Sequence, residues 1–414
     1  MRSVLLSVFL CLLACLGASA QTSVSGQTMA LPAAQADTLE TDSVVVSLLT
    51  CSPGTEVYQL YGHTALRVTD SRRHLDLVFN YGVFDFRTPH FTWRFILGQC
   101  DYQVAAYPYE LFLEEYRERG SSVTEQVLNL TPTETLRLCQ ALALNALPEN
   151  RTYRYDFLRN NCTTRARDMV EQALDGHVAY EESPEPRTYR QLLHRCTQDY
   201  PWSALGNDML LGADCDTLLS DRAAQFLPAQ LMSYMEGAQV FDSLENRRPL
   251  VRETRLLLAE DARRMAARKA VLPLGGRLTP RVVGWGLVAL GLVVALVEYR
   301  TRRMWWMVDA LLMSLQGVAG LLLCFMFLFS EHPTVDSNWQ VLLFHPLALL
   351  LMPWVVRSAR HRKVCLYHYA NMLCLVLFLG FMPWIPQDFS TLTLPLALVL
   401  LIRPMSYYLH YSRT

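Results

Sequence analysis

The feature that most constrains the fold is a series of long apolar runs in the last third of the chain. Five runs follow Arg281, at residues 282–297, 304–329, 339–356, 364–384 and 392–409, and the first is short. A membrane-spanning helix needs about 20 mostly apolar residues, with a range of about 17–25. Because backbone groups inside a bilayer must bond within their own segment, the sequence predicts a bundle of five membrane-spanning helices.

The loops between these runs differ in charge. EYRTRR, RSARHRK and HYSRT, after the first, third and fifth runs, are basic, whereas SEHPTVDSN and IPQDFS contain no Lys or Arg. Basic loops stay on the cytoplasmic side of a membrane. We therefore expect the C-terminus in the cytoplasm and the first helix to enter the membrane from outside.

The first twenty residues have the pattern of a signal peptide. Arg2 supplies the positive start, residues 4–17 the apolar core, and Ala18-Ser19-Ala20 a small-residue cleavage site. The alternative is a lipoprotein signal ending at Cys15, but the bulky Leu13 stands where a small residue is usual. The signal peptide and the charges of the loops together predict a multi-pass inner-membrane protein with an N-terminal domain in the periplasm.

Net charge and cysteine spacing argue against a nucleic-acid-binding protein and against a metal-binding protein. The net charge of −1 argues against nucleic-acid binding. We expect no metal and no cofactor, because no CxxC pair or His/Cys cluster has metal-ligand spacing. The soluble part contains six cysteines, an even number that permits disulfides: Cys51, Cys100, Cys139, Cys162, Cys196 and Cys215. We expect Cys196 to pair with Cys215.

The part before the apolar runs alternates between strand and helix patterns. SVVVSLLT, the hairpin around His63 and SSVTEQVLNL favour strands, and Thr131, Pro132 and Glu134 favour a capped helix start. The sequence predicts an α+β domain over residues 41–185. Residues 186–278 read as mostly helical, and 248–269 as a charged amphipathic helix that leads to the membrane.

Two short segments hold the residues with reactive side chains. In YGHTALRV, Gly62 permits close approach of another backbone or a ligand, and His63 begins a strand. In NNCTTRARD, Cys162 lies in the first turn of a helix, where free N–H groups and the helix dipole favour a thiolate. A cysteine and a histidine can be ordinary packing residues, but so many polar neighbours make a poor core. The pattern indicates a nucleophile and its base.

These segments carry a resemblance to a known family. A histidine first on a strand, a polar residue on the next strand and Asn-Cys at a helix start are similar to the circularly permuted papain-like fold. More closely, CSPG, YGHTALRV, FNYGVFDF, YRYDF, NNCTTRARD and the five-helix tail resemble the Lnb family. Lnb proteins are lipoprotein N-acyltransferases of Bacteroidetes, with a periplasmic papain-like domain joined to a five-helix membrane domain.

The resemblance implies roles for individual residues. Cys162 would be the nucleophile, His63 the base, and Asn80 the residue that orients the imidazole, with Asp85 as the alternative. The enzyme would move an acyl chain from a membrane phospholipid, through a Cys162 thioester, to the α-amine of a diacylated lipoprotein. The alternatives are a papain-like cysteine hydrolase of the envelope and a non-enzymatic binding module.

This reading divides the chain into four parts. They are a signal peptide (1–20), a papain-like catalytic domain (41–185), a mostly helical periplasmic extension (186–278) and a five-helix transmembrane domain (279–414).

Four polar residues of the membrane part stand out. We expect Asp309 to face a polar interior or reach water near the cytoplasmic end, and Arg403 to extend to the cytoplasmic surface. His332 and Asn338, in the loop SEHPTVDSNW, would contact a lipid headgroup or make ordinary loop packing.

Overall fold

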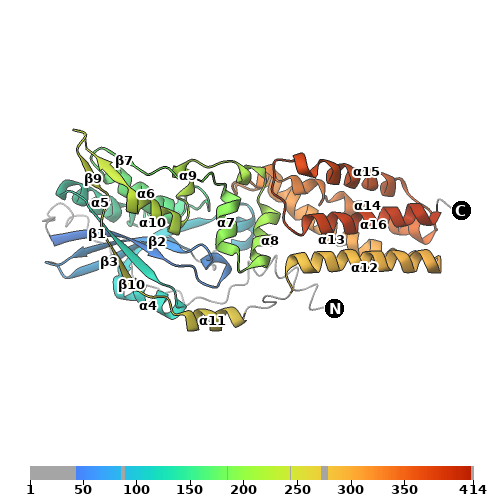
Figure 1. The fold of residues 1–414 in the computed structure, drawn as a ribbon, viewed down its shortest axis with the longest axis horizontal. Helices are drawn as coiled ribbons and strands as arrows, with labels where there is room; N and C mark the ends of the chain where they lie inside the picture. The colour runs from blue at the N-terminus through green and yellow to red at the C-terminus, as the bar shows by residue number, and fades with distance from the viewer. Residues whose placement is uncertain (1–42, 85–88, 184, 243, 272–277, 412–414) are drawn as a thin grey trace. The chain divides into compact units, whose positions relative to one another are not determined.

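The computed structural model describes residues 43–84, 89–183, 185–242, 244–271 and 278–411 (Figure 1). The expected signal peptide and Asp85 lie outside the described residues. The chain divides into two compact units. The first comprises residues 1–196 and 218–273, and the second comprises residues 197–217 and 274–414.

The first unit is built on an antiparallel sheet. In the described residues its seven strands run in the order β10-β5-β1-β2-β3-β4-β6. Their bounds are β1 Val44–Cys51, β2 His63–Asp70, β3 Leu75–Val83, β4 Asp101–Pro108, β5 Val123–Leu128, β6 Thr152–Arg154 and β10 Val251–Leu258. A smaller sheet joins β7 His177–Ala179, β8 Gln239–Phe241 and β9 Arg247–Pro249.

Helices pack on both faces of the large sheet, because successive side chains of a strand point to opposite faces. Leu66 and Val68 of β2 join the core beneath helices α5 (Pro132–Asn145), α6 (Cys162–Ala173) and α10 (Pro228–Gly237). Ala65 joins the core on the other face, beneath α4 (Tyr109–Arg119). The other helices described in this unit are the 3-10 helix η2 Val57–Gln59 and the α-helices α3 Phe91–Ile96, α7 Tyr189–Thr197, α9 Asp221–Ala224 and α11 Ala262–Val271.

The α+β prediction is confirmed, and so is the helix start at Thr131. Its Oγ1 accepts a hydrogen bond from Glu134 N at 3.3 Å, and its N–H donates to Glu134 Oε2 at 2.7 Å. The predicted amphipathic helix over 248–269 is wrong. Val251–Leu258 form β10, which pairs with β5, and α11 begins only at Ala262. Long-range strand pairing overrides the helical pattern there.

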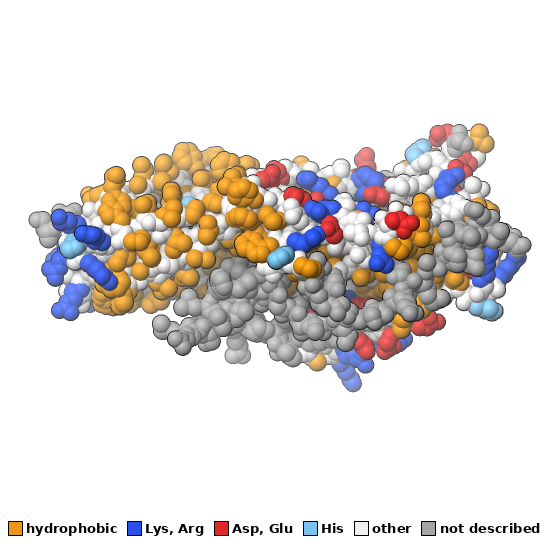
Figure 2. Space-filling model, turned by 180° about the vertical axis from the view of Figure 1, so that it is seen from behind, with side chains coloured by type: hydrophobic (Ala, Val, Ile, Leu, Met, Phe, Trp, Pro, Cys, Tyr) orange, Lys and Arg blue, Asp and Glu red, His pale blue; other side chains and the backbone are white. Residues whose placement is uncertain are grey.

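The second unit is a helical bundle. Its long helices are α12 Pro280–Thr301, α13 Trp306–Phe329, α14 Leu347–Arg360, α15 Leu366–Phe381 and α16 Thr393–Tyr411. Among the described residues, four segments are long and apolar enough to cross a membrane: Pro280–Thr301, Trp306–Phe329, Trp339–Arg360 and Leu366–Trp384. The fifth predicted run forms α16, which packs against α12 and α15. Figure 2 shows hydrophobic side chains over the bundle surface and basic side chains gathered at one end.

An ion network joins three helices inside the bundle. Arg403 of α16 donates to Asp309 of α13 at 2.8 and 3.0 Å and to Glu298 of α12 at 2.7 Å. Arg403 is only 7% exposed, so the expectation that it extends to the surface is wrong. Two carboxylates on other helices hold it in the interior. The expectation that Asp309 faces a polar interior is confirmed.

A segment that precedes β8 in the chain belongs to this second unit. It comprises α8 Pro201–Leu210 and the 3-10 turn η3 Ala213–Asp216. Asn338 Nδ2 donates to Met209 O at 2.9 Å, and Gln340 Nε2 donates to Asp208 O at 2.6 Å. Asn338 is 2% exposed, so it makes loop packing and does not face a lipid headgroup. The expected disulfide is also wrong, because no disulfide bond joins Cys196 and Cys215.

Replacing Arg403 by Met should destabilise the bundle, because Glu298 and Asp309 would remain as buried carboxylates without their cation. Breaking a buried ion pair from one side costs about 3 kcal/mol or more. Thermal unfolding of the full chain in detergent should show a lower midpoint for Arg403→Met. Arg357→Met, on the exposed surface of the last turn of α14, is the control. Equal midpoints for the two variants would contradict a stabilising role for the network.

Candidate active site

His63 begins β2 and faces the side chain of Asn80 on β3. The two strands are antiparallel, with Leu66 opposite Phe79, which makes His63 and Asn80 diagonal neighbours. His63 Nε2 lies 2.6 Å from Asn80 Oδ1. Gly62 has a φ of 78°, and a Cβ there would lie 2.7 Å from Cys51 O. The close backbone approach that the sequence predicted before His63 is therefore confirmed.

Tyr107 of β4 fixes the orientation of the Asn80 amide. Asn80 Nδ2 donates to the Tyr107 hydroxyl oxygen at 2.7 Å, so its Oδ1 is left to accept a hydrogen bond from His63 Nε2. With Nε2 engaged in this way, Nδ1 is the ring nitrogen available to Cys162. The sequence analysis missed Tyr107. Strand alternation alone could not show which strand would pair with β3.

Cys162 is the first residue of α6, as the sequence predicted. Asn161 is the N-cap, and its Oδ1 accepts from Thr163 N at 2.8 Å and Thr164 N at 3.0 Å. The Asn161 Nδ2 donates to the backbone oxygens of Phe157 and Phe226 at 2.7 and 3.0 Å. The cap therefore ties the start of the helix to two other segments. This arrangement holds the half-buried thiol in place.

Two contacts bring the start of α6 against β2 and β3. Thr64 Oγ1 and Thr163 Oγ1, each next in sequence to a candidate catalytic residue, lie 3.2 Å apart and are buried. Gly82 of β3 has a φ of 107°, which favours glycine. A Cβ built there would lie 3.5 Å from His63 Cε1 and 3.7 Å from Cys162 Cβ. The imidazole and the cysteine therefore border the same point of β3.

The electrostatics of the site favour a thiolate. Burial acts to raise the pKa of Cys162, but the charge of His63, its hydrogen bond and those from Thr64 N–H and Thr163 lower that pKa to about 7. Burial acts to lower the pKa of His63, but the Cys162 charge and the hydrogen bonds to Cys162 and Asn80 raise it. The arrangement favours a thiolate–imidazolium pair, which is the activated form of a cysteine nucleophile.

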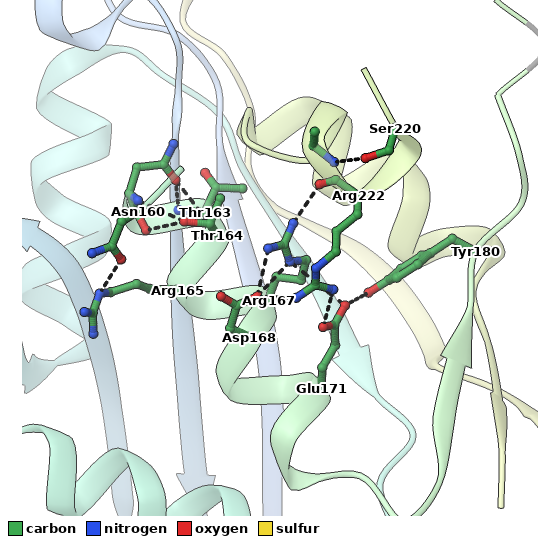
Figure 3. A network of polar contacts seen from close by, with 12 residues as sticks. Asn160, Thr163, Thr164, Arg165, Arg167, Asp168, Glu171, Tyr180, Ser220 and Arg222 are labelled. Atoms are coloured by element: carbon green, nitrogen blue, oxygen red, sulfur yellow. Dashed lines mark hydrogen bonds and ion pairs between the residues drawn. The ribbon is translucent and has the colours of Figure 1, made fainter. Parts of the chain in front are cut away.

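A polar network anchors the rest of α6 (Figure 3). The buried Arg167 donates to Arg222 O at 2.8 Å and to Asp168 Oδ1 at 2.8 and 3.0 Å. Arg222 pairs with Asp168 and with Glu171, which also accepts from Tyr180 OH at 2.7 Å. The polar residues that follow Cys162 therefore make specific bonds that fix the helix.

The structure brings Cys162, His63 and Asn80 together at one place, whereas Asp85 lies outside the described residues. Among the side chains that the structure describes, no group of three or more His, Cys, Asp or Glu could hold a metal ion. The arrangement offers a nucleophile, a proton carrier and a group that orients the carrier. These are the parts of a covalent transfer or hydrolysis reaction.

Comparison with protein families gives two matches. Residues 30–195 match the Lnb N-terminal periplasmic domain, and residues 274–414 match the Lnb transmembrane domain. No curated protein and no solved structure matches the chain. His63, Asn80 and Cys162 all lie within the first matched range.

The rate at which iodoacetamide labels Cys162, measured for that peptide by mass spectrometry, should increase with pH. The midpoint of the increase should lie near pH 7, because the thiolate is the reacting form. The His63→Ala variant should move this midpoint upward, since the cation that favours the thiolate is lost. Cys196 in the same samples is an internal control, because burial raises its pKa to about 11. Equal midpoints for Cys162 and Cys196 would contradict the ion pair.

Proposed function

Because the chain belongs to the Lnb family, with a periplasmic domain and a transmembrane domain, we propose that it is a lipoprotein N-acyltransferase with Cys162 as its nucleophile. The family indicates a lipoprotein-processing membrane enzyme. The observation that carries the finer proposal is the Cys162–His63–Asn80 arrangement within the periplasmic domain. Its order along the chain, with the His strand first and the Cys helix last, fits a circularly permuted papain-like enzyme.

In the first step, the Cys162 thiolate attacks the ester carbonyl carbon of a phospholipid. A carbon–sulfur bond forms and the ester carbon–oxygen bond breaks. The departing glycerol oxygen takes the proton from His63 Nδ1, which leaves a lysophospholipid, a thioester and a neutral imidazole. We propose that the backbone N–H of Cys162, in the first turn of α6, stabilises the oxyanion.

In the second step, the α-amine of a diacylglyceryl-cysteine attacks the thioester carbon. His63 Nδ1 takes a proton from the amine, and the Cys162 thiolate leaves. The products are an N-acylated lipoprotein and the original thiolate–imidazolium pair. Throughout both steps, Asn80 keeps Nε2 protonated and Nδ1 directed at the reaction.

The membrane unit supports this proposal over a soluble reaction. Donor and acceptor are both confined to the bilayer, so a tethered catalytic unit meets them at a high local concentration. The basic ends of α12 and α14 support a cytoplasmic C-terminus and an inner-membrane location. A single helix would be enough for anchoring, and we propose that the larger bundle also contacts substrate. The domain boundaries 41–185, 186–278 and 279–414 remain predictions.

The Cys162→Ser and His63→Ala variants should each fail to restore N-acylated lipoproteins in a strain that lacks its own acyltransferase. Wild-type protein should restore them, and all variants should reach the membrane. The reason is that one variant lacks the nucleophile and the other the proton carrier. Cys196→Ser, outside the site, is the matched control and should behave as wild type. Near-normal acylation by either site variant would contradict the assigned roles.

Asn80→Ala should lower acyl transfer by about ten- to a thousand-fold, since a residue that orients an imidazole matters less than the nucleophile. Tyr107→Phe should have a smaller effect, because the amide loses its acceptor but keeps its contact with His63. Initial rates with a defined lipoprotein acceptor would measure both effects. Activity of Asn80→Ala within about twofold of wild type would move the role to another residue, and Asp85→Ala would then be the variant to measure.

A further inference from the structure

Four aromatic side chains from separate segments stack into a row in the first unit. The aromatic row consists of Phe91 of α3, Phe84 after β3, Tyr102 of β4 and Tyr155 after β6. The ring centroids of Tyr155 and Tyr102 lie 4.0 Å apart, those of Tyr102 and Phe84 4.7 Å, and those of Phe84 and Phe91 6.3 Å. The interplanar angles are 17°, 18° and 18°, so the rings are nearly parallel.

One end of the aromatic row lies beside the nucleophile. Tyr102, Tyr155 and Cys162 pack against the same hydrophobic core. Burial raises the pKa of the Tyr102 and Tyr155 hydroxyls, and the nearby charge of the Cys162 thiolate raises both further. Tyr155 and Tyr102 are therefore close enough to Cys162 for the charge of its thiolate to act on both hydroxyls.

The other end of the aromatic row reaches the surface. Helix α3 has no buried residue, and its Trp93 is 58% exposed. Tyr58 meets the edge of Phe84 with a centroid distance of 6.4 Å and is itself partly exposed. The four rings of the row are partly buried, and the row continues from the core at Tyr155 to α3, whose residues are all at least partly exposed. Apolar rings that reach the surface in this way are typical of a binding surface.

Among the described residues, the carboxylate that precedes Tyr102 in the chain is paired with two cations. Asp101, which precedes Tyr102, accepts from Arg94 of α3 and from Arg154 Nε, the latter at 2.9 Å. All four members of the row are uncharged. The surface therefore suits an apolar ligand, because no carboxylate or guanidinium of the row would need to be desolvated on binding.

We propose that the aromatic row binds the hydrocarbon chain of the lipid acyl donor, with the ester at Cys162 and the chain running toward α3. This proposal rests on the proposed function, because its occupant is the acyl chain that Cys162 would receive. The parallel rings supply a continuous apolar wall for methylene groups. An acyl chain needs such a wall and no hydrogen-bonding partner.

Photocrosslinking with the full chain tests this proposal. The probe is a phosphatidylethanolamine with a diazirine near the end of one acyl chain, in vesicles of phosphatidylethanolamine and phosphatidylglycerol. Crosslinks should fall on peptides of α3 and β4, and Phe84→Asp should reduce them by about tenfold. Phe84→Leu, which stays apolar, should keep most of them. Phe241→Asp is the matched control, because that ring stacks on His177 in the smaller sheet.

A folding check and a second readout separate the possible outcomes. Iodoacetamide labelling of Cys162 in Phe84→Asp shows whether the site has survived, and Phe91→Asp replaces that variant if it has not. The Cys162 thioester is measured in the same samples. Crosslinks to the aromatic row without a thioester would support binding of the acyl chain by the row and contradict acyl transfer. Two results would overturn the proposal that the aromatic row binds the acyl chain. One is a thioester with crosslinks outside the row, and the other is equal crosslinking in the wild type and the folded Asp variant.

Discussion

The pairing of the Cys162 thiolate with the His63 imidazolium is the interaction on which the candidate site depends. Burial raises the pKa of a thiol, and in Cys139 burial together with the charge of Asp70 raises the pKa to about 12. Cys162 packs against the same core, yet its pKa is lowered to about 7. The cation and hydrogen bond of His63 are the largest causes of this lowering, and hydrogen bonds from Thr64 N–H and Thr163 add to it. The sheet and α6 serve to hold these two side chains in contact.

The surrounding structure fixes the positions of both His63 and Cys162. Three neighbouring strands supply His63, Asn80 and Tyr107, and each bond fixes the donor and acceptor roles of the next group. On the other side, the Asn161 cap and the Arg167 network hold α6 at both ends of its first two turns. A reaction that moves one proton between fixed atoms benefits from such preorganisation.

The two units are joined by more than one covalent connection. The chain passes from the first unit to the second after residue 196, returns after residue 217 and leaves again after residue 273. The segment between the first two crossings bonds to the loops of the bundle through Asn338 and Gln340. Inside the bundle, Arg403 joins α12, α13 and α16.

Local signals in the sequence were sufficient for some elements and insufficient for others. Asn161 and Cys162 could be placed at a helix start because capping depends on the next three residues. The pairing of β10 with β5, the contact between Asn80 and Tyr107, and the burial of Arg403 all depend on residues far apart in sequence. The disulfide expected between Cys196 and Cys215 does not form, because the spacing of cysteines in a sequence does not determine which of them pair.

The most direct test of the central claim is the mass of the Cys162 peptide after incubation of the full chain with a phospholipid in vesicles. The account predicts an added acyl group on Cys162 that hydroxylamine removes and a lipoprotein acceptor discharges. The same peptide from a His63→Ala sample should stay unmodified. An unmodified Cys162 in the wild-type protein, together with release of free fatty acid, would contradict acyl transfer and favour hydrolysis by another route.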